Sequence, residues 1–422
     1  MSELSYLEKL LDGVEVEWKP LKDVCDFKNG FAFKSSLFKE TGLPIVRITN
    51  IDGFNVDLDE VKYFSLNDYK EDLSSFEVSM GNILIAMSGA TTGKVGIYKK
   101  GTKCYLNQRV GKFIPKENIL NNNYLYHFLL LNTETIYILA GGGAQPNLSS
   151  NALMSKLLIP IPCPDNPEKS LAIQSEIVRI LDKFTALTAE LTAELTAELN
   201  MRKKQYNYYR DQLLSFDEGE VEWKALGEVA KIQRGASPRP IVNYLTEQGN
   251  GIPWIKIGDT IPGSKYIDKT LQKITAEGAQ KSRILNPGDF VISNSMSFGR
   301  PYILRITGAI HDGWASISNF GEKLNADYLY HYLSSKKVKN YWESKINSGS
   351  VSNLNADIIK TLPVPLPDKQ KQERISALLD KFDTLTNSIT EGLPREIELR
   401  QKQYEYYRDL LFSFPTPETV SN

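Results

Sequence analysis

Cysteine and histidine are scarce in this chain of 422 residues, which has three of each. Cys25, Cys104 and Cys163 lie far apart, no Cys-x-x-Cys pair occurs, and no histidine is their close neighbour. Disulfide frameworks and structural zinc sites need several cysteines at short spacing. The sequence therefore predicts neither, and it fits the reducing environment of the cytoplasm.

Long hydrophobic runs and a recognisable signal peptide are also missing. The most apolar stretch, residues 124–144, is interrupted by Asn132 and Glu134. A helix that crosses a membrane needs about 20 predominantly apolar residues in sequence. We therefore expect no membrane association.

The chain has no excess charge of either sign, since its formal net charge is −1. A strongly basic balance would have indicated a nucleic-acid partner. Residues 219–361 nevertheless hold 18 Lys and Arg residues against 13 Asp and Glu residues. This distribution permits DNA binding without indicating it.

Motifs of known catalytic chemistry are absent from the sequence. The segment SGATTGK (88–94) resembles a phosphate-binding loop, but only three residues separate its glycines, and Val95 follows the lysine where Ser or Thr is needed. The Glu-Trp-Lys triplets at 17–19 and 222–224 have the spacing of a metal nuclease, yet no Pro-Asp pair lies upstream. No Asn/Asp-Pro-Pro-aromatic methyltransferase motif occurs. The sequence predicts no catalytic residue, no metal site and no cofactor on this chain.

Glycine and proline are missing from residues 171–216, and this stretch organises the chain. Its centre repeats Thr-Ala-Glu-Leu three times, at 188–191, 192–195 and 196–199. Ala, Glu and Leu are strong helix formers, and apolar residues recur every three or four positions before the repeats. We predict one helix of more than 40 residues, which needs a partner helix along its apolar stripe.

The partner is predicted within the same chain, because the helical sequence is duplicated. LDKFTALT (181–188) recurs as LDKFDTLT (379–386), and RKKQYNYYRDQLLSF (202–216) recurs as RQKQYEYYRDLLFSF (400–414), both at an offset of 198 residues. The second copy carries Gly392 and Pro394 between these segments, so we expect its helix to break or kink there.

The duplication extends into the rest of the chain. VEWKPLKDV, GNILI, YLYHFL and the proline-rich LIPIPCP of the first half match VEWKALGEV, GDFVI, YLYHYL and TLPVPLP of the second. Short β-branched runs mixed with a few helices predict an α+β class. We expect two similar α/β domains separated by an antiparallel pair of long helices, with a pseudo-twofold internal repeat.

These matches divide the chain into six predicted segments. They are a short N-terminal helix (1–12), a first globular domain (13–158), a proline hinge with the central helix (159–218), a second globular domain (219–361), a second hinge and helix (362–414) and a tail (415–422). The loops between matched elements differ strongly, which is how one scaffold forms two related recognition surfaces.

Three features leave more than one interpretation open. His127 and His331 fall at matched positions beside tyrosines, and we favour a structural role in a helix over catalysis. His311 is followed by Asp312 in a loop and could contact a base or a phosphate. The two QYxYYRD helices could touch DNA phosphates, but tyrosines at helical spacing favour helix packing or subunit contact.

Taken together, these features resemble the specificity subunit of a type I restriction–modification system. The resemblance covers essentially the whole chain. It rests on the two LDKF and QYxYYRDxLxSF segments, the proline hinges, the TAEL repeats and the framework sequences FAFKSSLF, GNILIAMSGATTGK and LNQRVGKF. TAEL repeats in the central segment are typical of the type IC branch.

The resemblance implies that each globular domain is a target-recognition domain for one half of a bipartite site in double-stranded DNA. It implies that the helices form a coiled-coil spacer that binds two modification (adenine methyltransferase) subunits. Restriction subunits would translocate and cleave DNA. S-adenosylmethionine, ATP and Mg²⁺ would then be cofactors of the partner subunits, and this chain would be a non-catalytic specificity subunit.

Polar and basic residues in the loops after matched strands are the predicted DNA contacts, because Arg, Gln and Asn can read base edges while Ser, Thr and Lys more often hold phosphates. In the first domain they are Arg47, Thr49, Asn50, Ser88, Thr91, Thr92, Lys94, Gln108 and Arg109. In the second domain they are Lys256, Asp259, Asn294, Ser295, Ser297, Arg300, His311 and Trp314. The predicted spacer and partner-binding residues are Phe184, Leu191, Leu195, Leu199, Tyr206, Tyr209, Phe382, Tyr404 and Tyr407.

Two other classes of protein remain open from the residues alone. A coiled-coil adaptor would bind proteins through its globular domains and would not retain DNA in a sequence-dependent way. An enzyme with an unrecognised site would act without partners. The DNA sequence that either domain reads does not follow from the loop sequences.

Overall fold

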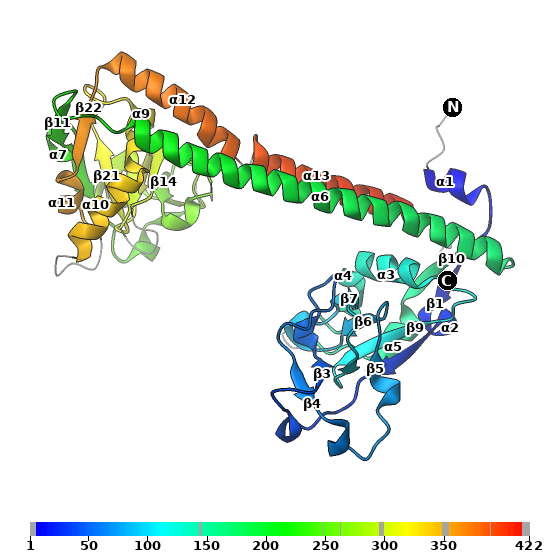
Figure 1. Cartoon of the computed structure of the whole chain (residues 1–422). Helices are drawn as coiled ribbons and strands as arrows, with labels where there is room; N and C mark the ends of the chain where they lie inside the picture. Colours follow the sequence, from blue (N-terminus) through cyan, green and yellow to red (C-terminus); the bar gives the residue numbers. More distant parts are fainter. Residues whose placement is uncertain are drawn as a thin grey trace. The chain divides into compact units, whose positions relative to one another are not determined.

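The computed structural model describes residues 6–142, 146–247, 249–261, 263–294, 299–347, 354–388 and 390–415. The chain forms two compact units (Figure 1). Unit 1 comprises Met1–Ala189 and Gln401–Asn422, and unit 2 comprises Glu190–Arg400. Each unit therefore combines a globular domain with helical segments from both repeats of the sequence.

The described residues of unit 1 form three small sheets. A two-stranded sheet pairs β1 (Val16–Pro20) with β10 (Leu158–Pro162). A four-stranded sheet has the order β2 (Cys25–Asn29), β9 (Val110–Pro115), β6 (Ile83–Ala86), β7 (Val95–Ile97). A second has the order β4 (Lys62–Phe64), β3 (Leu43–Val46), β8 (Cys104–Leu106), β5 (Glu77–Val78), in which β3 and β8 are parallel.

The helices of the unit 1 globular domain are short. They are α1 (Tyr6–Leu11), α2 (Leu21–Val24), α3 (Asn122–Leu131), α4 (Thr133–Leu139) and α5 (Ser150–Lys156). Alternate residues of β6 serve two cores, because successive side chains of a strand point to opposite faces. Ile83 and Ile85 pack with the helices, whereas Leu84 and Ala86 pack with the second sheet.

Unit 2 repeats this arrangement with one additional strand in each larger sheet. β11 (Glu222–Ala225) pairs with β22 (Pro363–Leu366). One five-stranded sheet has the order β12 (Lys231–Arg234), β21 (Trp314–Ser318), β18 (Phe290–Ser293), β19 (Pro301–Leu304), β15 (Tyr266–Ile267). The other has the order β13 (Leu245–Thr246), β16 (Gln272–Ile274), β14 (Ile252–Ile255), β20 (Gly308–Ile310), β17 (Arg283–Leu285).

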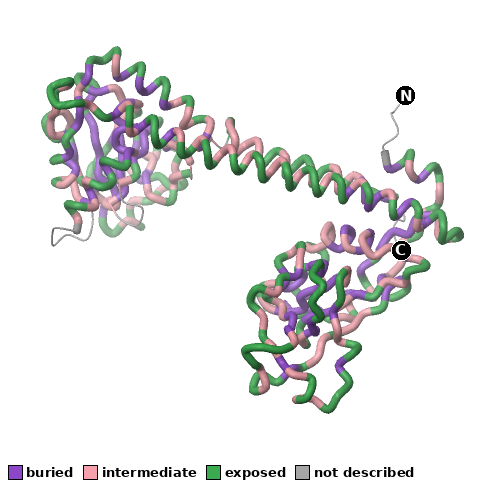
Figure 2. Tube along the Cα trace, viewed as in Figure 1, coloured by how far each residue is buried: buried purple, intermediate pink, exposed green. Residues whose placement is uncertain are grey.

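The helices of the unit 2 globular domain follow the same order. They are α7 (Leu226–Val229), α8 (Ala276–Gln280), α9 (Ala326–Leu333), α10 (Lys336–Asn347) and α11 (Ala356–Lys360). In Figure 2 the buried residues of each unit concentrate in its sheets and in the helices that cover them. The predicted α+β class and the internal repeat are confirmed.

The long central helix is confirmed as α6 (Pro167–Leu213), 47 residues in one piece. The TAEL leucines Leu191, Leu195 and Leu199 are half-buried along it. None of the described helices is long and apolar enough to cross a membrane.

The predicted break in the second copy is also confirmed, because α12 (Lys369–Asn387) ends before α13 (Leu393–Leu411) begins. Gly392 has a φ of +85°, and a Cβ there would lie 2.6 Å from the Thr384 carbonyl oxygen and 2.8 Å from that of Leu385. The turn between the two helices therefore requires glycine.

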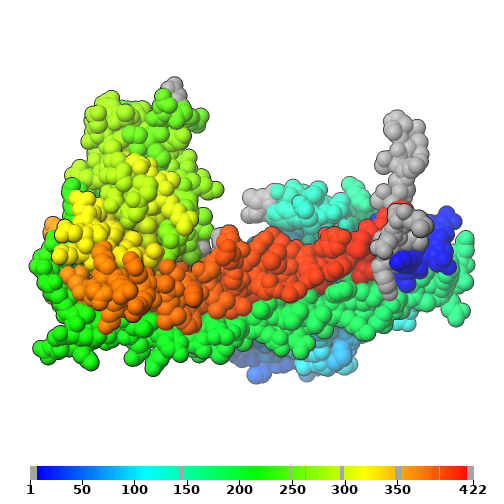
Figure 3. Space-filling view, turned by 90° about the horizontal axis from the view of Figure 1, so that it is seen from above, coloured from blue at the N-terminus to red at the C-terminus, as the bar shows by residue number. Residues whose placement is uncertain are grey.

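Each unit packs the helix that follows its globular domain against the QYxYYRD segment of the other repeat. In unit 1 the Phe184 ring of α6 stacks on Tyr407 of α13, with ring centroids 5.1 Å apart. In unit 2 the Phe382 ring of α12 stacks on Tyr209 of α6 at 5.6 Å. The red end of α13 lies against α6 in Figure 3. The two stacks are equivalent to one another, because Phe382 and Tyr407 lie 198 residues after Phe184 and Tyr209.

Candidate nucleic-acid interface

A matched turn follows strand β3 of unit 1 and strand β14 of unit 2. β3 leads into a 3-10 turn, Ile48–Asn50, and β14 leads into the turn Ile257–Asp259. Asn50 Oδ1 accepts a hydrogen bond from the backbone N–H of Arg47 at 2.9 Å, and its Nδ2 donates to the Glu60 carbonyl at 3.2 Å. Asn50 is 5% exposed. The prediction that Asn50 faces DNA is therefore wrong, because its amide holds the turn together.

Asp259 plays the same part in unit 2. Its Oδ2 accepts from the backbone N–H of Lys256 at 2.7 Å and its Oδ1 from that of Leu271 at 2.9 Å. The turn needs an acceptor at this position, and Asn or Asp supplies one. Both carboxylate oxygens of Asp259 are occupied within the domain.

The side chains that these turns present are basic or hydroxylic. Arg47 is half-buried, and its Nε is buried without a hydrogen-bond partner among the described residues. Thr49 is exposed. Lys256 Nζ donates to Gln272 Oε1 at 2.8 Å. The predicted roles of these three residues in DNA contact stay predictions.

A second loop of unit 1 follows β6 and lies beside the first turn. Thr91 Oγ1 donates to the Ile48 carbonyl at 3.2 Å, which ties the two loops together. Thr92 is buried, and its Oγ1 donates to the Gly89 carbonyl at 2.7 Å and lies 3.2 Å from that of Pro146. Thr92 is therefore part of the framework, and the prediction that it faces DNA is wrong.

The two ends of this loop differ in their exposure. Ser88 is buried, and its Oγ has no partner among the described residues. Lys94, at the other end, is exposed. Gly93 before it has a φ of +86°, a conformation that glycine adopts without strain. The loop therefore presents a lysine at the surface.

The turn between β8 and β9 is the third loop of the candidate interface of unit 1. The Asn107 backbone N–H donates to the Val46 carbonyl at 3.0 Å, and that of Met87 donates to the Arg109 carbonyl at 2.9 Å. These bonds bring the turn next to the loops after β3 and β6. Gln108 and Arg109 are exposed there.

Unit 2 brings the corresponding loops together through the corresponding bonds. The His311 backbone N–H donates to the Ile255 carbonyl at 3.1 Å, and that of Asn294 donates to the Gly313 carbonyl at 3.1 Å. Asn294 Oδ1 is buried without a partner among the described residues, and Arg300 is exposed. Ser295 and Ser297 lie outside the described residues.

Trp314 does not belong to the surface of this edge. It is 0% exposed, and its Nε1 donates to the Ile255 carbonyl at 3.2 Å. The prediction that Trp314 faces DNA is wrong, because the indole fills the core beneath the loops.

His311 remains at the surface, with its side chain 42% exposed. Its Nδ1 lies 2.9 Å from the Gly313 backbone N–H and 3.1 Å from Asp312 Oδ1. A neutral ring accepts from Gly313, and a protonated ring pairs with Asp312. Burial alone would raise the pKa of Asp312, but the nearby His311 and Arg239 hold that pKa below its ordinary value.

His127 and His331 join the globular domains to the helices, as their predicted structural role requires. His127 Nε2 lies 2.9 Å from Asp182 Oδ1 of α6, and His331 Nε2 lies 2.9 Å from Asp380 Oδ1 of α12. His331 Nδ1 also bonds the Tyr206 hydroxyl at 2.9 Å, whereas His127 Nδ1 has no partner among the described residues.

The predicted spacer and partner-binding aromatics are largely used within the chain. Phe184, Tyr407, Tyr209 and Phe382 form the two stacks, and the Tyr404 hydroxyl lies 3.2 Å from Thr185 Oγ1. Sequence reasoning missed the apolar residues that the helices expose. Exposed fractions are 45% for Met201, 61% for Tyr208, 43% for Leu399 and 63% for Tyr406. Their equivalence at the 198-residue offset was the signal that could have found them.

No constellation for metal or thiol chemistry accompanies these loops. Across the described ranges, no group of three or more His, Cys, Asp or Glu side chains could hold a metal ion. Burial raises the pKa of both Cys25 and Cys104 to about 12, which keeps these thiols protonated and unreactive.

In comparison with known sequences, one family model matches two separate parts of the chain. A family model described as "Type I restriction modification DNA specificity domain" matches residues 13–201 and again residues 218–399. The EcoR124I/EcoR124II specificity subunit of a type I restriction enzyme from Escherichia coli is 42% identical over 431 residues, covering 100% of both chains. The EcoprrI specificity subunit from the same organism is 36% identical over 423 residues, covering 93% of each chain.

Solved structures share the fold. A chain from a structure described as the basis of complex assembly and conformational transition of the type I R-M system has a TM-score of 0.67 at 18% identity, covering 94% of this chain and 97% of that chain. The HsdS subunit from Thermoanaerobacter tengcongensis has a TM-score of 0.53 at 18% identity, covering 94% of this chain and 96% of its own.

Proposed function

Because this chain belongs to the family of type I restriction–modification specificity subunits, we propose that each of its units reads one half of a bipartite target in double-stranded DNA. Its relatives are DNA-recognition components rather than the enzymes of their systems. The observation that carries the proposal is the matched convergence of loops. In each unit the same backbone bonds bring together turns whose exposed side chains differ.

The contacts that we propose are the predicted loop residues that reach the surface. In unit 1 these are Arg47, Thr49, Thr91, Lys94, Gln108 and Arg109, and in unit 2 they are Lys256, Asn294, Arg300 and His311. Arg reads guanine through its O6 and N7 atoms, and Gln or Asn pairs with adenine. Ser88 and Asp259 belong to the same loops, and their predicted contacts with DNA stay predictions. Ser295 and Ser297 stay predictions.

One substitution in each unit tests this assignment. Arg109→Ala should weaken specific binding by roughly 1–3 kcal/mol and relax the sequence read by one half-site, and Arg300→Ala should do the same for the other half-site. Binding of the full complex to duplex libraries measures both affinity and preference. If both variants kept their affinity and both half-site preferences, the assignment of this edge would fail.

The catalytic work of the system belongs to other chains in this proposal. The helices bind two adenine methyltransferase subunits, which hold S-adenosylmethionine, and restriction subunits use ATP and Mg²⁺ to translocate and cleave DNA. The exposed Tyr208 and Tyr406 at equivalent helix positions are suited to such contacts, since aromatic side chains are enriched in protein interfaces. The TAEL repeats support assignment to the type IC branch.

The repeats also act as a ruler in this proposal. Removing one TAEL unit shortens a helix by about 6 Å and turns the remainder of the helix by about 40°. One base pair advances a duplex by about 3.4 Å and rotates it by about 35° in the same sense. We therefore expect deletion of Thr196–Leu199 to keep both half-site sequences and to shorten the unspecified spacer by one base pair. Mapping of methylated adenines measures this, and an unchanged spacer would exclude the ruler.

A further inference from the structure

Arg300, one of the proposed DNA contacts, lines a cleft of about 620 Å³ in unit 2. Four cationic side chains line it, and Asp383 is the only acidic residue among its described lining. The cations are Lys203 and Arg210 of α6, Arg300 just before β19 and Lys339 of α10. Cationic side chains from α6, from α10 and from the segment before β19 therefore line the same cleft.

The cations of the cleft are only weakly neutralised by the protein. Lys203 has no hydrogen bond or ion pair within the part of the chain that the structure describes, and Lys339 lies 3.8 Å from Glu343. Arg210 is 7% exposed, with its guanidinium 3.3 Å from Asp211 and over the Tyr206 ring. The lining of the cleft has more cationic than acidic side chains, and a buried guanidinium in such a lining is suited to binding an anion.

The end of a helix adds to this field. Ser335, just before α10, and Lys339, in its first turn, line the cleft, and Ser335 Oγ accepts from the Val338 backbone N–H at 3.3 Å. The N-terminus of a helix carries partial positive charge and attracts phosphate. Trp342 also lines the cleft and is 1% exposed, and its Nε1 has no hydrogen-bond partner among the described residues.

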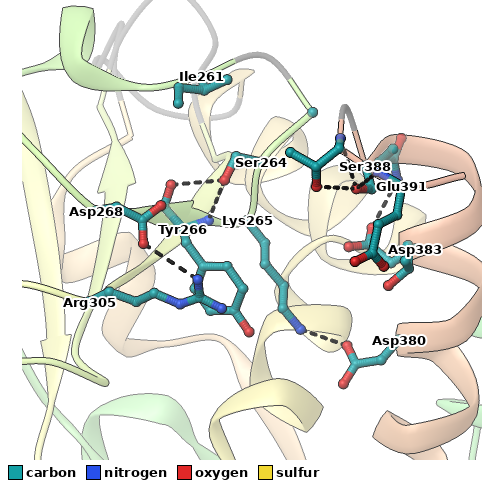
Figure 4. A pocket seen from close by; sticks show the side chains of 14 residues that line it. Ile261, Ser264, Lys265, Tyr266, Asp268, Arg305, Asp380, Asp383, Ser388 and Glu391 are labelled. Carbon is teal, nitrogen blue, oxygen red and sulfur yellow. Dashed lines mark hydrogen bonds and ion pairs between the residues drawn. The ribbon is translucent and has the colours of Figure 1, made fainter. Parts of the chain in front are cut away.

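A neighbouring pocket of unit 2 shows what a neutralised site looks like. In Figure 4, Lys265 reaches toward Asp380, at 2.6 Å, and it also pairs with Asp327 at 2.9 Å. Arg305 there lies 3.5 Å from Asp268 and over the Tyr266 ring. Because its cations are already paired, that pocket has no comparable surplus for an anion.

Unit 1 differs from unit 2 at several positions that line the cleft. Gln401 and Glu405 stand at the positions equivalent to Lys203 and Asn207, and Leu130 and Leu131 stand where unit 2 has Ser334 and Ser335. The lining of this cleft therefore differs from that of the equivalent positions in unit 1.

We propose that this cleft binds phosphate groups of the DNA backbone beside the half-site that unit 2 reads. The inference rests on the proposed function and adds a sequence-independent contact to it. DNA is favoured over an acidic protein segment because Arg300, a proposed DNA contact, is itself part of the lining of the cleft. Contacts of this kind fix the position of the duplex without reading its bases.

The test uses the full chain assembled with the methyltransferase subunits of its system, and the variant Lys203→Gln/Lys339→Gln. Lys203→Gln installs the residue that unit 1 itself carries at the equivalent position. Each phosphate contact contributes about 0.9 to the slope of log K against log salt. We expect the slope to fall by about one to two, affinity for specific and unrelated duplexes to fall together, and the methylated sequence to stay unchanged.

The matched control is Lys204→Gln, which removes an exposed lysine one position along α6 that does not line the cleft. Its slope should equal that of the unaltered complex. If the double variant behaved like this control, or lost methyltransferase subunits while keeping its slope, the inference would be overturned. Failure of the unaltered complex to prefer any sequence would instead overturn the proposed function, and the two failures are thus distinguishable.

Discussion

Units 1 and 2 share a framework but hold their globular domains to the helices in different ways. In unit 1 the contact is largely apolar, since Phe412 is buried against Tyr124 and Phe128 with ring centroids 5.2 and 6.1 Å apart. In unit 2 apolar residues such as Leu379 are also buried at the contact, and a polar network of Lys265, Asp380, His331 and Tyr206 is added to it. Duplication has therefore kept the geometry of the junction while the forces that hold it have diverged.

The largest effect should come from the apolar junction. Phe412→Ala should destabilise unit 1 by about 3–5 kcal/mol, because it removes a buried aromatic side chain and leaves a cavity. Hydrogen exchange, read separately for amides of α3 and α9, measures the stability of each junction. Exchange should accelerate in α3 and not in α9. Equal acceleration in both helices would mean that the two junctions are not independent.

The polar junction should respond next most strongly. Asp380→Ala leaves Lys265, whose side chain is 10% exposed, with Asp327 as its remaining partner. Removing one member of a buried ionic network costs about 3–5 kcal/mol, and we expect about 2–3 kcal/mol because the Asp380 side chain is 34% exposed.

Asp182→Ala is the matched control in unit 1, where the side chain is 55% exposed. It should cost less than about 1 kcal/mol. Hydrogen exchange of α9 and α3 again gives the two values. A similar cost for both substitutions would contradict the polar character assigned to the unit 2 junction.

A third comparison is between the turn that separates α12 from α13 and the equivalent, uninterrupted part of α6. Gly392→Ala should destabilise the turn by more than about 1 kcal/mol, because the residue has a positive φ and its Cβ would meet two carbonyl oxygens. Glu194→Gly, at the equivalent position of α6, should cost about 0.5–1 kcal/mol through lost helix propensity. Local exchange in each helix measures both effects.

The smallest effect should be a difference in response to pH. Burial lowers the pKa of His127, with Arg408 acting in the same direction and Asp182 opposing both. A histidine with a lowered folded-state pKa stabilises the fold fully above its unfolded value of about 6.5 and loses that contribution as pH falls below it.

The anchoring carboxylate of unit 2 should respond only at lower pH. Burial would raise the pKa of Asp380, but His331 and Lys265 hold it below its ordinary value. Its contribution is therefore complete above about pH 4 and is lost as pH falls further. Between pH 7 and 5 the contribution of His127 should decline while that of Asp380 persists. His127→Gln should remove this pH dependence from the exchange of α3, and a persisting dependence would contradict its origin in His127.

Much of this comparison could be predicted from the sequence, because repeats and helix signals are local. The absence of glycine and proline predicted α6, and Gly392 with Pro394 predicted the break between α12 and α13. The matched strand sequences identified the loops that converge in each unit.

The direction of individual side chains could not be predicted in the same way. Asn50 and Thr92 are polar loop residues, but each satisfies backbone groups within the domain. Trp314 fills a core that only the complete fold defines. The cationic cleft joins Lys203 to Lys339 across 136 positions of sequence, and no local pattern indicates such a meeting.

The central claim is that the two units recognise two halves of one DNA target independently. The most direct test replaces residues 13–158 with the corresponding domain of a relative that methylates a different sequence, and maps methylated adenines across a genome. We expect one half of the methylated sequence to change to that of the relative, while the other half keeps its sequence. A change in both halves, or in neither, would contradict the account.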